Sequence, residues 1–174
     1  MIKQTSATRI TGYTGLILTL SWLFYFLSKV DISLIYYWQQ TIPLSFGEAL
    51  QYPGDISCVL GERYLELLTQ PFPGGIGTAL LVVIVFFSLH IMFRRYKGNP
   101  LYFALLLATL IPYILLFAHY RLPAGLIMNM TTGLLLAAIH NLYSPQKLVT
   151  RSVYSFITGI VVFLVSGAAG FLVL

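Results

Sequence analysis

Residues 74–97 read GGIGTALLVVIVFFSLHIMFRRYK. Residues 74–93 contain no Asp, Glu, Lys or Arg, and the basic residues Arg94, Arg95 and Lys97 follow at once. About 20 apolar residues are what a helix needs to cross a bilayer. Basic residues collect at the cytoplasmic ends of such spans. This stretch therefore predicts a transmembrane helix over residues 74–93 and identifies its cytoplasmic end.

Four other apolar segments have a similar length, at residues 10–28, 100–118, 122–143 and 152–174. The connections between the last four of the five spans are short, so neighbouring helices run antiparallel and pack as a bundle. Residues 29–73 form the one long connection. The predicted fold class is an all-α membrane protein, with five transmembrane helices and one long outer loop that carries an amphipathic interfacial helix.

The composition excludes an ordinary soluble domain. Hydrophobic residues make up 58% of the chain and charged residues 9%, whereas soluble domains are about 25% charged. The net charge of +5 does not point to nucleic acid, because the basic residues flank apolar runs as in membrane proteins. Cys58 is the single cysteine. It therefore allows no intramolecular disulfide and no cysteine-based metal cluster, and we expect no metal site.

The distribution of Lys and Arg predicts the orientation. With the N-terminus in the cytoplasm, the cytoplasmic segments hold Lys3, Arg9, Arg94, Arg95, Lys97, Lys147 and Arg151. The outer segments hold only Lys29, Arg63 and Arg121. No small-residue cleavage site follows the first span, which favours a signal anchor. We expect a multi-pass protein of a bacterial inner membrane, with its N-terminus cytoplasmic and its C-terminus on the outer side.

Residues 1–174 form a single membrane domain, and the apolar run of the last span continues to Leu174. Two interpretations remain open. The last helix just reaches the interface, or these residues are the N-terminal membrane part of a longer protein. We favour the second, since membrane proteins usually close such a span with polar residues.

The outer loop predicts one amphipathic helix, because apolar residues recur at helical spacing between Ile56 and Thr69. Asp55 is the expected N-cap, Arg63 can pair with Glu66 at i+3, and the segment from Pro71 ends the helix. Such a helix lies on the membrane or docks on the bundle.

All five acidic residues lie between residues 31 and 66: Asp31, Glu48, Asp55, Glu62 and Glu66. Glu62 and Glu66 stand one turn apart, so they are candidates for holding a divalent cation or for acid–base work. The favoured alternative is that they hydrate the polar face of the helix. His119 is a further catalytic candidate in the short loop after residue 118. Arg121 is a candidate contact for a phosphate or a lipid headgroup, or alternatively a snorkelling interfacial residue.

Polar residues inside the predicted spans are few. Asn129, with Thr132 on the same face, predicts an interhelical hydrogen bond. Gly133 with Ala137, and Ser166 with Gly170, have the spacing that lets helices approach closely. No charged residue lies in the middle of a span, which counts against a transporter. No phosphate loop, dinucleotide fingerprint or nucleophile elbow is found, so the sequence predicts no cofactor.

The segment Pro53-Gly54-Asp55, followed by Tyr64-Leu65-Glu66-Leu67-Leu68-Thr69-Gln70-Pro71-Phe72 and Gly77, resembles the N-terminal membrane region of an uncharacterised Bacteroidetes family of polytopic inner-membrane proteins. In that family a Pro-Gly-Gly turn precedes a short helix that leads directly into a span. The chain departs from the pattern with Asp55 in place of the second Gly and with Pro71 after the Gln. The resemblance implies a layout but no activity.

The architecture is also similar to the beginning of polyprenyl-phosphate-dependent glycosyltransferases of the multi-span C-type superfamily. That resemblance implies a catalytic base at Asp31, with His119 and Arg121 facing a lipid-linked phosphate. The favoured function is instead a membrane anchor, a scaffold or a subunit of a membrane assembly. Its expected partners are the lipid bilayer and other membrane subunits or further copies of the chain.

Overall fold

The structure is a computed structural model. It describes residues 51–96, 100–117, 123–145 and 147–167, together with positions 13, 17, 20, 21, 24, 45 and 47. Within these residues every regular element is a helix. In chain order the elements are α4 (Asp55–Leu68), α5 (Pro71–Met92), the short 3-10 helix η1 (Phe93–Tyr96), α6 (Pro100–Phe117), α7 (Ala124–Tyr143) and α8 (Leu148–Ser166). The predicted all-α class is confirmed for this part of the chain.

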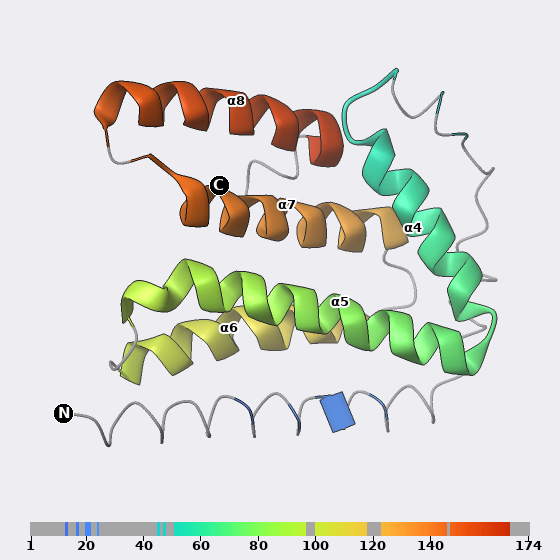
Figure 1. Ribbon diagram of the computed structural model, residues 1–174. Coiled ribbons are helices and arrows are strands. Elements are labelled where there is room, and N and C mark those ends of the chain that lie inside the picture. Colours follow the sequence, from blue (N-terminus) through green and yellow to red (C-terminus); the bar gives the residue numbers. More distant parts are fainter. Residues whose placement is uncertain are drawn as a thin grey trace.

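Helices α5, α6, α7 and α8 lie side by side, and α4 crosses one end of them (Figure 1). Helix α7 is central, since it packs against α4, α5 and α8. The end that α4 covers is made by the starts of α5 and α7 and by the end of α8. Of the two orientations predicted for the loop helix, docking on the bundle is the one observed.

Three helices are long and apolar enough to cross a membrane: Phe72–Met92, Ala124–Tyr143 and Leu148–Ser166. Helix α6 contains a shorter apolar helical segment, Ala104–Leu116. In the predicted first span, residues 10–28, the described positions 13, 17, 20, 21 and 24 are helical, and the others lie outside the described residues. The described residues thus contain three candidate spans, and the predicted count of five is not reached within them.

Two predicted helix boundaries were wrong. Helix α5 begins at Pro71, three residues before the expected start, because proline is well accommodated in the first turn of a helix. Helix α8 begins at Leu148 instead of residue 152 and ends at Ser166. No residue between Leu148 and Arg151 breaks a helix, so it extends beyond the apolar run. It ends because Gly167 adopts a positive φ of 62°.

The predicted N-cap of α4 was also wrong. The cap position is Gly54, with φ 95°, and Asp55 is the first helical residue. The left-handed backbone of Gly54 makes the tight entry into the helix, which an L side chain tolerates poorly. Asp55 still favours the helix start, because a carboxylate in the first turn complements the helix dipole.

The interior contains apolar residues from α4, α5, α6 and α7, and its hydroxyl groups are paired. Tyr64 and Thr78 form a hydrogen bond of 2.7 Å between α4 and α5. Tyr113 and Thr131 form one of 2.6 Å between α6 and α7. Such bonds let polar groups remain in an apolar interior without a desolvation penalty. They tie α4 and α6 to the two neighbouring long helices.

Candidate functional site

The structure describes only some of the predicted site residues. Glu62 and Glu66 both lie on α4. Asp31, His119 and Arg121 lie outside the described residues, and so does Glu48. The arrangement in which Asp31 is the base while His119 and Arg121 face a lipid-linked phosphate therefore stays a prediction.

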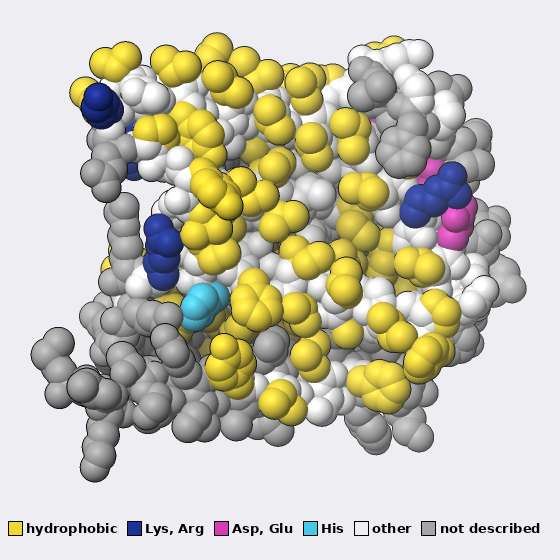
Figure 2. All heavy atoms as spheres, viewed as in Figure 1, with side chains coloured by type: hydrophobic (Ala, Val, Ile, Leu, Met, Phe, Trp, Pro, Cys, Tyr) yellow, Lys and Arg dark blue, Asp and Glu magenta, His cyan; other side chains and the backbone are white. Residues whose placement is uncertain are grey.

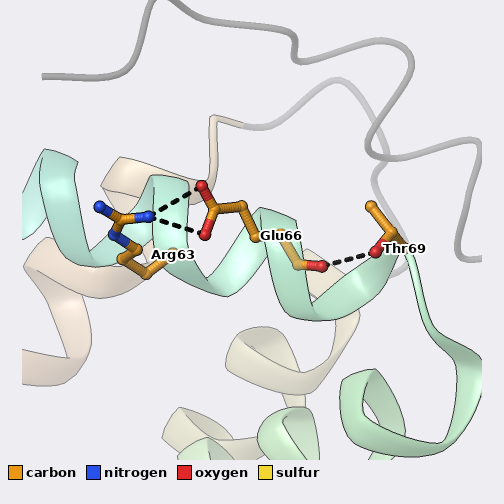
Figure 3. A network of polar contacts seen from close by, with 3 residues as sticks. All are labelled: Arg63, Glu66 and Thr69. Carbon is orange, nitrogen blue, oxygen red and sulfur yellow. Dashed lines mark hydrogen bonds and ion pairs between the residues drawn. The ribbon is translucent and has the colours of Figure 1, made fainter.

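Glu66 is held by its neighbours on α4. The Arg63 guanidinium donates to both of its carboxylate oxygens, with Nη1 at 3.0 and 2.9 Å, while the Thr69 hydroxyl donates to its backbone carbonyl at 2.7 Å (Figure 3). The predicted i, i+3 pair is thus confirmed. The side chains of Arg63 and Glu66 are 61% and 53% exposed, so the pair contributes well under about 1 kcal/mol to stability. Glu66 is a hydrated surface group.

Glu62 is half-buried on the same helix. No group of three or more His, Cys, Asp or Glu side chains comes together within the described ranges. The role of Glu62 and Glu66 in cation binding or acid–base chemistry stays a prediction, as does the alternative of a hydrated polar helix face.

A buried hydroxyl cluster forms where α4, α7 and α8 meet. We define the three-helix junction as Ser57, Thr132 and Ser166. Ser57 Oγ lies 3.2 Å from Thr132 Oγ1 and donates to the backbone carbonyl of Val165 at 2.7 Å. Thr132 Oγ1 lies 2.8 Å from Ser166 Oγ. Ser57 and Ser166 have no exposed surface. The junction fastens α4 and the end of α8 to the same turn of α7.

Asn129, one turn before Thr132 on α7, does not behave as predicted. Its side-chain oxygen is buried and has no hydrogen-bond partner within the described part of the chain. Thr132 makes the interhelical bonds instead, and it also donates to the backbone carbonyl of Met128 at 2.8 Å. A hydroxyl can bond its own helix and a neighbour together, which suits this crowded junction better than the larger amide.

Two glycine contacts bring backbones together beside the junction. A Cβ atom on Gly61 would lie 2.6 Å from the backbone nitrogen of Gly125, and one on Gly54 would lie 3.1 Å from Gly167 Cα. The backbone nitrogen of Gly54 also donates to the carbonyl of Leu164 at 3.1 Å. The sequence interpretation missed Gly61 and Gly125. The four-residue spacing of Ser57 and Gly61 was the available signal.

Cys58 lies beside the same crossing. A Cβ atom on Gly125 would lie 3.3 Å from its Sγ. Burial, then the charges of Asp55 and Glu62, raise the pKa of the Cys58 thiol. A raised pKa disfavours the thiolate, which is the nucleophilic form. Cys58 is thus a packing residue and a poor nucleophile.

The opposite end of the bundle has histidine contacts between helices. His140 Nδ1 lies 3.3 Å from the Thr158 hydroxyl on α8, and its ring stacks on Tyr154 with centroids 5.0 Å apart. His90 on α5 is hydrogen-bonded to the Tyr102 hydroxyl on α6. Each histidine thus bonds to a neighbouring helix, and the two lie on separate helix pairs.

The hydroxyl and histidine contacts described above join neighbouring helices. Comparison with protein-family models, with curated proteins and with solved structures gives no match to this chain.

Proposed function

We propose that this chain is a membrane-embedded helical module that anchors or assembles with other membrane subunits and is not itself an enzyme. The carrying observation is the outer surface of the described helices, which is covered by large apolar side chains. Five hydroxyl residues are fully or nearly buried within the apolar interior: Ser57, Thr78, Ser88, Thr131 and Ser166. Large apolar residues cover the outside, and Phe156 and Leu115 are 71% and 56% exposed. Lipid is the solvent in which that surface is stable.

Helix α8 illustrates this most clearly. Three of its hydroxyl residues, Ser155, Thr158 and Ser166, bond to α7. Its exposed residues include Val153, Phe156, Ile157, Ile160 and Leu164. A helix on the surface of a water-soluble domain would have the reverse arrangement. The polar face of α8 therefore supports a lipid-facing position for its other side.

Charge separation supports the orientation that we propose. The described acids Asp55, Glu62 and Glu66 all lie on α4, whereas Arg94, Lys147 and Arg151 lie at the opposite ends of the long helices. Figure 2 shows Lys and Arg at one end, Asp and Glu with one basic group at the other, and hydrophobic side chains between them. By the positive-inside rule, the basic end is cytoplasmic and α4 lies at the outer interface.

The proposal retains five spans. Helix α6 has 18 residues, which at about 1.5 Å per residue rise about 27 Å, close to the ~30 Å hydrocarbon core. The helical positions among residues 13–24 support a further span over residues 10–28. In this topology the N-terminus is cytoplasmic and the C-terminus is on the outer side of a bacterial inner membrane. The resemblance to the Bacteroidetes membrane region is compatible with it.

Topology is tested with single cysteines in a Cys58→Ser background. Tyr52 is 68% exposed before α4, and Tyr96 is 48% exposed in η1. We expect a membrane-impermeant maleimide to label Tyr52→Cys in intact cells and to label Tyr96→Cys only after permeabilisation. Labelling of Tyr96→Cys from outside would overturn the orientation.

The assembly role is tested by photo-crosslinking in native membranes. A photoreactive residue at Leu107 or Ile111, exposed on α6 at 48% and 50%, is expected to give a protein adduct of defined mass. The same residue at the fully buried Val82 is the control and should give none. A lack of adducts at every exposed apolar position would contradict assembly.

Loss of cellular function in a Glu62→Gln/Glu66→Gln variant that still assembles would favour the enzyme alternative.

A further inference from the structure

Three basic side chains gather at the end of the bundle opposite α4. Arg94 follows α5 in η1, and its Nη2 lies 3.5 Å from the backbone carbonyl of Asn141 near the end of α7. Lys147 is the residue before α8, and Arg151 is one turn further along that helix. We call Arg94, Lys147 and Arg151 the basic corner.

No described carboxylate neutralises the basic corner. The acids that the structure describes all lie on α4, at the other end of the long helices (Figure 1). The ion pair that forms within the described ranges joins Arg63 and Glu66, and both residues lie on α4. Lys147 and Arg151 are exposed. Such a patch attracts an anion.

An apolar surface begins directly beside this corner. In the first turns of α8, Leu148 and Val149 are 80% and 76% exposed, and Val153 and Phe156 follow at 54% and 71%. Figure 2 shows basic side chains at this end next to a continuous hydrophobic face. A soluble phosphate or a nucleic acid would contact only the basic residues. A phospholipid has a charged headgroup followed by apolar acyl chains, so it matches both the basic corner and the apolar residues beside it.

We propose that the basic corner binds the phosphate headgroup of an anionic phospholipid, whose acyl chains lie along the exposed face of α8. Lys147 is the N-cap of α8, and its backbone carbonyl accepts from the backbone nitrogen of Arg151 at 2.8 Å, so both long side chains start from the first turn of the helix and can reach one headgroup. Arg94 adds positive charge from η1, beside the end of α7, the helix that packs against α8. Membrane proteins recognise anionic lipids with basic clusters of this kind at the ends of their helices.

The inference rests on the proposed membrane location but not on the assembly role. Each basic residue near an anionic surface contributes about a five-fold change in affinity, which is ~1 kcal/mol per residue. Removing both Lys147 and Arg151 should therefore reduce preference for an anionic lipid on the order of 25-fold.

The experiment measures lipids retained by the purified full chain in native mass spectrometry, after exchange into mixed micelles of phosphatidylglycerol and phosphatidylcholine. We expect the wild type to retain phosphatidylglycerol selectively and Lys147→Gln/Arg151→Gln to lose that selectivity. Lys147→Arg should keep it, because the charge is conserved. Arg63→Gln is the matched control, since it removes one positive charge at the α4 end and should retain the selectivity. Thermal unfolding shows that each variant is folded.

A second arm separates a lipid site from a phosphate site. Millimolar inorganic phosphate or glycerol phosphate should not displace phosphatidylglycerol, because neither covers the apolar face of α8. Displacement by either would overturn the lipid assignment. Unchanged selectivity for phosphatidylglycerol in the double variant would show that the basic corner is not the binding site. An equal loss of selectivity in Arg63→Gln would show the same. A chain that inserts into membranes without lipid selectivity refutes this inference alone, whereas a chain that does not insert refutes the proposed function.

Discussion

At the residue scale, the contact of Gly61 with Gly125 explains how α4 can cross α7 so closely. Side-chain atoms on either glycine would separate the backbones. The loss of that contact would also lengthen the hydrogen bonds of Ser57, one turn earlier on α4. The contact therefore places the three-helix junction, although neither glycine carries a functional group.

We expect Gly61→Ala to destabilise the protein by about 1–3 kcal/mol, because the added methyl group overpacks a backbone contact. Its Cβ would lie 2.6 Å from the Gly125 nitrogen. Gly75→Ala is the matched control. A Cβ there meets nothing within 4 Å, so the change should be neutral or stabilising by up to ~1 kcal/mol through helix propensity. Thermal unfolding in detergent measures both, and equal stabilities would show that the helices are not in contact there.

The thiol of Cys58 provides a pH-dependent probe of α4. Because the pKa of this thiol is raised, alkylation at pH 8 should be slower than that of a free cysteine and should accelerate at higher pH. Asp55→Asn/Glu62→Gln removes two of the causes of the shift, so the rate should rise at fixed pH. Burial is the largest cause and persists. Glu66→Gln is the control. A pH profile like that of free cysteine would show that α4 is undocked.

At the scale of elements, α4 is a docked cap whose contact face differs from its apolar face. Val59, Tyr64 and Leu68 are buried as the helical spacing predicts, but Leu60 and Leu67 are 36% and 46% exposed. Ser57 and Gly61 are buried in their place. For a helix that faces lipid, an apolar residue does not indicate a buried position, because exposing an apolar side chain to lipid costs little free energy. Small residues and satisfied hydroxyls mark the contact instead.

Thr132→Val should destabilise the docking of α4 by about 1–2 kcal/mol, because it removes the hydroxyl that links Ser57 and Ser166. Valine keeps the shape, so packing changes little. Thr109→Val on α6 is the matched control, since the Thr109 hydroxyl donates to its own helix at Leu105 and Leu106. Hydrogen exchange of α4 amides measures local opening. Equal hydrogen-exchange rates of the α4 amides in both variants would show that the three-helix junction does not hold α4 in place.

At the scale of the whole molecule, the described helices enclose an apolar interior with a few paired hydroxyls, and large apolar side chains also cover their outer faces. Polar residues have two separate roles in this arrangement. Hydroxyls hold the interior together in pairs, and charged groups mark the two ends.

Ile157→Lys should impair membrane insertion of α8, because a charge near the centre of a span costs about 3 kcal/mol. Ile157 is 54% exposed and lies mid-helix. Val149→Lys should be nearly neutral, since that residue lies at the start of the helix beside Lys147. Fusions to a reporter active only on the outer side measure insertion. Equal insertion of both variants would contradict a lipid-facing α8.

The sequence by itself determined that the chain is helical, where its apolar helices lie and that Arg63 pairs with Glu66, because these follow from local periodicity and spacing. It predicted helix ends less well. Turns such as Gly54 and Gly167 depend on what packs against them. Only the tertiary structure decided that α4 docks on α7, that Thr132 and not Asn129 makes the interhelical bonds, and that Lys147 and Arg151 have no described acid nearby. Those features join residues far apart in the chain, and inside a membrane no apolar pattern specifies which faces meet.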